Sequence, residues 1–372
     1  MTPLGATVFV AFISLFAVFF VVGALLAKKQ SKILAEKAAA MRLAMKEKAA
    51  ADPAWDPAAI ERRIQEVFLG FQRAWSDLDA EAMRGLLTDD YYRRAVLEIN
   101  VLYNQKRRNL MEEVGIFRVD ILSFADAASG SGDQVKALIS AVARDTLKDI
   151  AADKVLMTDS RSFREYWTFR REGGAWKLDL IEQTTADARF IEWSIAEFAK
   201  SNGFYYDPDF GWLMMPDRGA IFRATNFGKS DINNHVIGYY RDKIVEFYSY
   251  RPDLKNKPKV NYVVAQAILP ISYHDILVSK RGWFERCPGG LTEHSLESPD
   301  FNKKYLVCAH PEDNVSALEL LTPNFMVHVE ELPYDLNIEV VDNVLYFYTL
   351  DRRCSYDQML QLLSYAFDEM KK

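Results

Sequence analysis

Cysteine is scarce in this chain, which has only Cys287, Cys308 and Cys354 among 372 residues. So few cysteines, odd in number, are typical of a protein kept in a reducing compartment, and no disulfide framework is expected. None of the five histidines has the spacing of a zinc motif; Cys308-Ala309-His310 is the only close pair, and two ligands do not make a metal site. No phosphate-binding loop, serine elbow or kinase signature is present. The sequence therefore predicts neither a metal nor a cofactor.

Basic residues clearly outnumber acidic ones in one short stretch of the chain. The formal net charge is -6, yet residues 28–48 contain seven basic and two acidic residues, so everything from residue 49 onward carries a net charge of -11. A nucleic-acid-binding surface needs a basic face. The acidic balance of the main part of the chain therefore argues against a nucleic-acid partner.

Charge is absent altogether from residues 1–27, and residues 6–27 form an apolar run long enough to cross a membrane. Because the lysines follow this run, we expect residues 1–5 to lie outside and the rest to face the cytoplasm, as in a single-pass protein of the inner membrane. A cleaved signal peptide is the alternative, with Val22-Gly23-Ala24 as its small-residue site. Against it, the chain has no basic n-region and the apolar run is long for a signal.

Residues 28–53 are rich in helix-forming residues and contain no glycine, and no proline before Pro53, which predicts a helical stalk. Its basic side chains lie where anionic head groups would be, and each gains about 1 kcal/mol from such a surface. The alternative is that they only fix the topology. The candidates for membrane-surface contact are Lys28, Lys29, Lys32, Lys37, Arg42, Lys46 and Lys48.

Residues 54–187 change from helical to strand periodicity. An apolar stripe at helical spacing runs from Ile60 to Trp75, and Asp79 and Asp89 can cap two further helices, the last reaching towards Arg108. Strands are then predicted, separated by glycine-rich turns, over 116–124, 135–144, 163–170 and 176–183. We expect an α+β domain with its helices packed on one face of a curved antiparallel sheet.

Several short motifs in this domain carry a family resemblance. They are the segment 68–77 (FLGFQRAWSD), Leu86-Leu87-Thr88 before a tyrosine pair, and the segment 163–170 (FREYWTFR) with Trp176-Lys177-Leu178. This part of the chain resembles the Tim44-like domain family, which belongs to the cone-shaped α+β group that also contains nuclear transport factor two and ketosteroid isomerase. Eukaryotic members tether an import motor at a translocation channel and touch cardiolipin-rich membrane, largely through segments outside this domain. The resemblance implies a cone that binds partners at a membrane.

The rest of the chain is expected to form a connecting helix, residues 188–202, and a second α+β domain of unknown function, residues 203–372. A hairpin is predicted around Arg241-Asp242-Lys243, with a further strand from Tyr262, a helix over 311–321 and a closing helix over 356–370. The aromatic and methionine-rich stretch 203–216 is either a loop packed in the core or a partner-binding surface.

The candidate pocket lies on the strand from Phe163, where alternate side chains share one face. Glu165 is therefore placed among aromatic residues. In a concave sheet, such a carboxylate could have a raised pKa and act as a general base. The alternative is a structural glutamate, hydrogen-bonded to a neighbour in a cone filled by its own helix. The pocket candidates are Phe71, Trp75, Phe163, Glu165, Trp167, Phe169 and Trp176.

The leading functional hypothesis is a membrane-anchored, cytoplasm-facing scaffold without catalytic residues, whose partners are a membrane protein complex or other proteins at the membrane. The alternative is a membrane-anchored enzyme or small-molecule binder that uses the aromatic pocket around Glu165. A third hypothesis is a module that contacts anionic lipid. An open pocket with convergent polar groups would favour the second, and a filled cone would favour the first.

Overall fold

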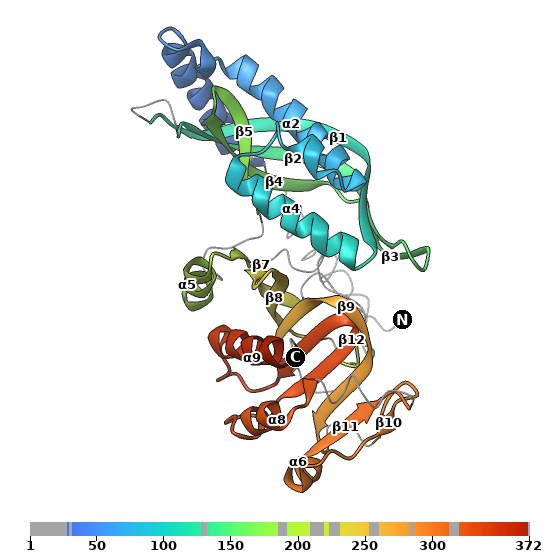
Figure 1. Ribbon diagram of the computed structural model, residues 1–372. Helices are drawn as coiled ribbons and strands as arrows, with labels where there is room; N and C mark the ends of the chain where they lie inside the picture. Colours follow the sequence, from blue (N-terminus) through green and yellow to red (C-terminus); the bar gives the residue numbers. More distant parts are fainter. Residues whose placement is uncertain are drawn as a thin grey trace, which may run out of the picture. The chain divides into compact units, whose positions relative to one another are not determined.

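The computed structural model describes residues 28–29, 32–127, 132–184, 192–208, 219–222, 231–252, 260–282, 286–311 and 320–370. The chain divides into two compact units (Figure 1). The first comprises the residues up to Ala95 with Arg108–Lys148 and Asp153–Thr184, and the second comprises Val96–Arg107, Asp149–Ala152 and Thr185–Lys372. Each unit has its own sheet.

The expected membrane span, residues 6–27, and the N-terminal residues 1–5 lie outside the described residues. Among the helices that the structure does describe, none is long and apolar enough to cross a membrane.

The helices α2 and α3 begin where the sequence predicts. The Asp56 side chain accepts hydrogen bonds from the backbone N–H groups of Ala58 and Ala59, and α2 ends where Leu78 takes a left-handed conformation with φ 54°. Asp79 caps α3 by accepting from Ala82. The helix α4 begins at Asp89 itself, and the side chain of Thr88, rather than that of Asp89, accepts a hydrogen bond from its first turn, from the N–H of Tyr91. The bounds are η1, Pro53–Trp55; α2, Pro57–Asp77; α3, Ala80–Met83; and α4, Asp89–Asn104, which begins in the first unit and continues into the second from Val96 onward.

The five strands of the first unit form one sheet in the order β1-β2-β4-β5, with β3 also paired to β2. The third helix was predicted to continue towards Arg108, but α4 ends at Asn104. Lys106 takes a φ of 54°, and β1 begins directly after it at Arg107. A second positive φ, 53° at Glu113, interrupts the alternation of β1, so sequence periodicity finds only its second half. The prediction also missed β3. Their bounds are β1, Arg107–Ala125; β2, Gln134–Asp149; β3, Lys154–Asp159; β4, Phe163–Glu172; and β5, Ala175–Gln183.

The segment expected to be a stalk is helical over 32–49, but its second half is part of the first unit. Ala38 and Met45, seven residues apart and so on one helix face, are 1% and 0% exposed. Arg42 Nε donates to Glu61 Oε1 of α2 at 2.5 Å, and Lys48 pairs with Asp126 just after β1. The second half of this helix is therefore bound to the domain that follows it.

The second unit is built on a seven-stranded antiparallel sheet in the order β10-β11-β9-β8-β7-β6, with β12 along the other edge of β9. The predicted hairpin is present, and Arg241 and Asp242 form its two-residue turn with φ 49° and 61°. The bounds are β6, Tyr205–Asp207; β7, Ile232–Tyr240; β8, Lys243–Tyr250; β9, Tyr262–Lys280; β10, Thr292–Glu293; β11, Tyr305–Ala309; and β12, Asn337–Thr349.

Helices cover one face of this sheet and form the main core with it (Figure 1). Phe198 of α5, Phe325 of α8 and Leu363 of α9 pack with alternate strand residues such as Val245 and Phe347. The expected connecting helix begins later, at Trp193, and the expected helix over 311–321 lies mostly outside the described residues, as does most of the stretch 203–216. The bounds are α5, Trp193–Asn202; α6, Pro299–Lys304; α8, Pro323–Glu330; and α9, Tyr356–Glu369.

Candidate functional site

The aromatic face predicted around Glu165 exists, and it is filled by α2. Trp167 and Phe169 of β4 are both 0% exposed. The ring of Phe68 lies 5.0 Å from that of Trp167, and the ring of Phe71 meets Trp167 edge-on at 5.7 Å. The ring of Phe163 is stacked with that of Phe68, with 6.5 Å between the ring centroids. Five candidate or neighbouring rings therefore pack against one another as a core.

Both carboxylate oxygens of Glu165 accept hydrogen bonds. Trp167 Nε1, two residues along the same strand, donates to Oε2 at 3.0 Å, and Gln183 Nε2, from the paired position on β5, donates to Oε1 at 2.8 Å. These neutral donors satisfy the carboxylate and hold it in place. This is the arrangement of a structural glutamate.

Trp75 lies on the same helix as Phe71 and begins a chain of polar contacts. Its Nε1 donates to Asn109 Oδ1 at 2.9 Å, and Asn109 Nδ2 donates to Asp145 Oδ1 at 2.5 Å. Asn109 is 2% exposed, and Asp145 is half-buried on β2. The sequence prediction missed Asn109, because a single asparagine in a strand carries no motif.

Asp145 and Glu165 are too far apart to act together. Glu165 is paired in register with Ile139 of β2, and Asp145 is six residues further along that strand. At about 3.3 Å per residue, the separation is roughly 20 Å. A third carboxylate of this unit, the buried Asp120 of β1, accepts a hydrogen bond from Arg118 Nε at 2.8 Å. The first unit therefore brings together no pair of these carboxylates for acid–base chemistry.

Trp176, the last pocket candidate, belongs to a different cluster. Its Nε1 donates to the carbonyl oxygen of Ala54 at 3.0 Å, and its ring meets Trp55 edge-on at 5.2 Å. Nearby, Arg171 bridges Asp52 and the buried Asp133, and its hydrogen bond lowers the pKa of Asp52. These contacts fix the N-terminal segment to the sheet.

The seven basic candidates differ in their surroundings. Arg42 and Lys48 are paired within the unit, as described above, and Lys32 lies 3.8 Å from Glu36 on the same helix. The other four are exposed and have no ion-pair partner among the residues that the structure describes: Lys28, Lys29, Lys37 and Lys46.

Comparison with protein families now identifies the first unit. Residues 41–183 match the Tim44-like domain family. This part of the chain is a Tim44-like domain. The match includes the second half of the helix over 32–49, in agreement with the contacts of Arg42 and Met45.

Two solved structures show distant likeness to the chain. The crystal structure of the mycobacterial trehalose monomycolate transport factor A, TtfA, has a TM-score of 0.36 and 14% identity, covering 48% of this chain and 92% of that chain. The intermembrane space region of the chloroplast protein ARC6 has a TM-score of 0.27 and 14% identity, covering 33% and 96%. No curated protein matches the chain.

Outside the Tim44-like domain, the second unit contains a buried polar network that the sequence prediction missed. Glu246 of β8 is 1% exposed; its Oε2 lies 2.8 Å from His235 Nε2 of β7, and its Oε1 accepts from Gln266 Nε2 of β9 at 2.6 Å. Tyr248 donates to Gln266 Oε1 at 2.8 Å. The available signal was a polar residue between apolar neighbours, such as Glu246 in β8 and Gln266 in β9, since such a residue needs a buried partner.

This network lies on the sheet face opposite the helices. Burial raises the pKa of Tyr248 well above its ordinary value, and the nearby Tyr346 and Glu246 raise it further. Its hydroxyl therefore stays protonated and remains a donor. Phe222 meets Tyr250 and Tyr346 edge-on at 5.2 and 5.9 Å on this face.

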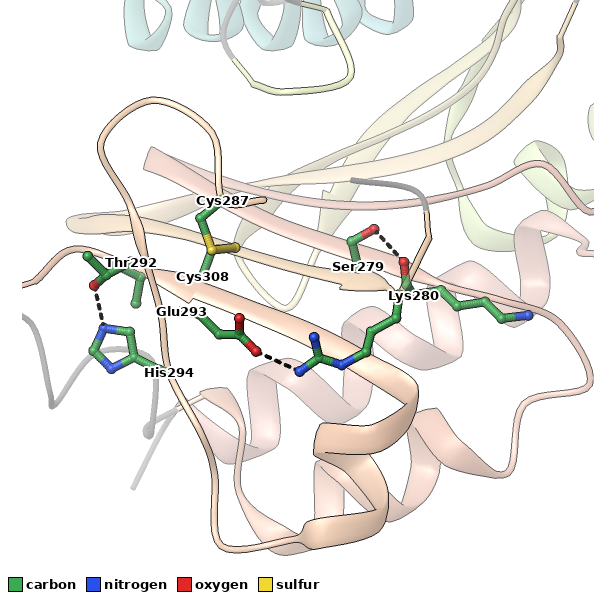
Figure 2. Close-up of a disulfide and its surroundings, with 9 residues drawn as sticks. Ser279, Lys280, Cys287, Thr292, Glu293, His294 and Cys308 are labelled. Atoms are coloured by element: carbon green, nitrogen blue, oxygen red, sulfur yellow. Dashed lines mark hydrogen bonds and ion pairs between the residues drawn. A yellow bond between two sulfur atoms is a disulfide. The ribbon is translucent and has the colours of Figure 1, made fainter. Parts of the chain in front are cut away.

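The structure contradicts the expectation that the cysteines remain unpaired. Cys287 and Cys308 form a disulfide, with their Cα atoms 5.6 Å apart (Figure 2), while Cys354 is a buried free thiol. The 21-residue separation hides this pairing from sequence spacing, because only the return of the chain to β11 brings the two together.

Metal ligands are not gathered in the described parts of the chain, where no group of three or more His, Cys, Asp or Glu side chains could hold a metal ion. The rings of His274 and His310 stack at 5.3 Å. Cys308, the partner considered for His310, is used by the disulfide.

Proposed function

We propose that this protein is a non-catalytic scaffold that holds protein partners at a membrane through its Tim44-like domain. In this proposal residues 6–27 anchor the chain, and the lysines that follow keep both units on the cytoplasmic side. The orientation is supported by the basic residues of 28–48, which follow 27 residues without a charged side chain. The family match supports a role in binding partners rather than in chemistry.

The filled aromatic face carries this proposal. A general base needs an approach for substrate. Here the rings of Phe68 and Phe71 cover Trp167, and the oxygens of Glu165 accept hydrogen bonds from Trp167 and Gln183. These contacts build a rigid domain, and they leave its outer surface for partners.

The replacement Glu165→Gln tests this assignment in the full chain. Glutamine keeps the shape and can still accept one hydrogen bond from Trp167 or Gln183, but it cannot take up a proton. We expect partners captured from detergent-solubilised membranes to be recovered as with the parent, with unfolding free energy changed by about 1 kcal/mol or less.

Trp167→Ala is the contrasting variant. It removes a fully buried indole, so a cost of about 3 to 5 kcal/mol and loss of partner recovery are expected from unfolding alone. A Glu165→Gln protein that folds normally and keeps its partners, yet fails to rescue a deletion phenotype that the parent rescues, would favour pocket chemistry over the scaffold.

Contact with anionic lipid is a second candidate function, favoured by the four exposed lysines. Vesicle binding by a fragment over 28–372 should fall when Lys28, Lys29, Lys37 and Lys46 become glutamine. It should also weaken with salt, since screening acts within about 8 Å at physiological ionic strength. The matched control replaces Arg42 and Lys48, which are held by Glu61 and Asp126, and should bind like the parent. Equal loss in both variants would exclude a specific lipid-contacting face.

A further inference from the structure

The two cysteines of the disulfide differ in exposure. Cys308 lies in β11, is 0% exposed and packs with Leu277 and Leu306. Cys287 is half-buried and precedes an exposed turn at Gly289 and Gly290, both with positive φ. In Figure 2 the segment that carries Cys287 crosses over β11. Of the two cysteines, only Cys287 is partly exposed to solvent, so it is the residue at which we expect a thiol in solution to attack.

The disulfide lies on a row of residues that runs across three strands. Cys308 is in register with Leu277 of β9, and Leu277 is in register with Glu339 of β12. Cross-strand partners share a face, so all three point to the side opposite the helices. This is the side that carries Glu246 and the buried tyrosines.

A second segment is attached to the same row. The backbone N–H of Ala220 donates to Glu339 Oε1 at 2.6 Å, and Ala220 packs against the cluster of Leu277, Leu306 and Cys308. The residue two places further, Phe222, is 2% exposed and lies on Tyr250 and Tyr346. The disulfide therefore attaches the segment of Cys287 to β11, and this segment packs against the same apolar cluster as Ala220.

We propose that Cys287 and Cys308 form a redox latch that fixes these two segments over the second face of the sheet. The latch rests on the proposed cytoplasmic orientation, because disulfides in that compartment are usually transient and redox-sensing. To close it, the Cys287 thiolate attacks a low-molecular-weight disulfide and expels one thiolate. Cys308 then gives up its proton and attacks the Cys287 sulfur, expelling the second thiolate. The pair loses two electrons and the small disulfide gains them.

Reduction of the Cys287–Cys308 disulfide reverses these steps, and it should leave β10 paired with β11. Thr292 and Glu293 remain paired with Ala309 and Cys308 through the backbone, and Arg281 Nη2 remains 2.6 Å from Glu293 Oε1. The change should therefore be confined to the covering segments. Local release of this kind is measurable by hydrogen exchange.

The first experiment compares hydrogen exchange of the purified full chain before and after reduction. We expect exchange to rise about tenfold, or about 1.4 kcal/mol, over 219–222 and 286–291. The hairpin of β7 and β8 should be unchanged. Cys287→Ser should behave as the reduced parent with or without reductant, and Cys354→Ala should respond to reduction as the parent does. Unchanged exchange at 219–222 in the reduced parent would overturn the latch, even if Cys287→Ser failed to fold.

The second experiment determines the state of the pair in cells by acid quenching and alkylation with a maleimide-polymer. Denatured chains carry three labels when reduced and one, on Cys354, when oxidised. We expect three labels in growing cells and one after treatment with diamide. Three labels after diamide would overturn the latch. One label in untreated cells would mean a permanent disulfide, which overturns both the latch and the cytoplasmic orientation. Partner capture by the Tim44-like domain would be unaffected by either result.

Discussion

Replacing His235 by leucine removes one of the two side chains, His235 and Gln266, that contact the buried carboxylate of Glu246. Glu246 is 1% exposed, so its charge cannot gain water in exchange for the imidazole that lies 2.8 Å away. Leaving a buried carboxyl group without one of its hydrogen-bond partners costs about 1 to 3 kcal/mol. We expect His235→Leu to destabilise the second unit by that amount.

The companion replacement Glu246→Gln separates charge from packing. Glutamine keeps an acceptor for Gln266 Nε2 and removes the charge, so alone it should cost about 1 kcal/mol. In the double variant no carboxylate is left without its histidine partner. Its cost should therefore be less than the sum of the two single costs by about 2 kcal/mol.

The assay is hydrogen exchange of the β8 amides in the full chain, because two units need not unfold in a single transition. Thermal unfolding followed by near-ultraviolet circular dichroism provides an independent measure. A cost below about 1 kcal/mol for His235→Leu, or strict additivity in the double variant, would refute the view that Glu246 is held as a buried charge.

Three further predictions concern packing and pH. Met45→Ala should lower the unfolding free energy of the Tim44-like domain by about 2 to 5 kcal/mol in thermal unfolding. Leu43, on the same helix, is 63% exposed, so Leu43→Ala should change that free energy by less than about 0.5 kcal/mol. Equal effects would contradict the packing of this helix on the domain. Gly238→Ala should destabilise the second unit by about 1 to 3 kcal/mol in thermal unfolding, because a Cβ there would lie 2.0 Å from the Phe204 ring. Gly85→Ala is the control for an added methyl group, because its Cβ would meet no atom within 4 Å. Burial raises the pKa of Cys354 from 9.0 to about 11 and that of Tyr305 from 10.0 to about 12. Above pH 9 the folded state therefore binds more protons than the unfolded state, and the unfolding free energy should fall as the pH rises from 9 to 12. The fall should be shallower in Cys354→Ala, and an identical slope would exclude the thiol as a cause.

The local structure of both units follows from the sequence. Asp56 before Pro57 starts α2 because a carboxylate caps free N–H groups and proline suits the first helical turn. The turn at Arg241 and Asp242 was recognisable between two apolar runs. Alternation on β4 correctly placed Phe163, Glu165 and Trp167 on one face, because the side-chain period of a strand is two residues. The resemblance to the Tim44-like family rests on such local motifs, and the family match at residues 41–183 confirms it.

What a face contacts was decided only by the tertiary structure. Periodicity could not show that α2 fills the aromatic face, that Gln183 completes the bonding of Glu165, or that Asp145 lies far along β2. It could not pair Cys287 with Cys308, or bring His235, Glu246 and Gln266 together from three strands. The physical reason is that periodicity reports which side chains are buried together with their near neighbours in the sequence. Partners that are distant in the sequence are set by strand order and register, which depend on the packing of the whole unit.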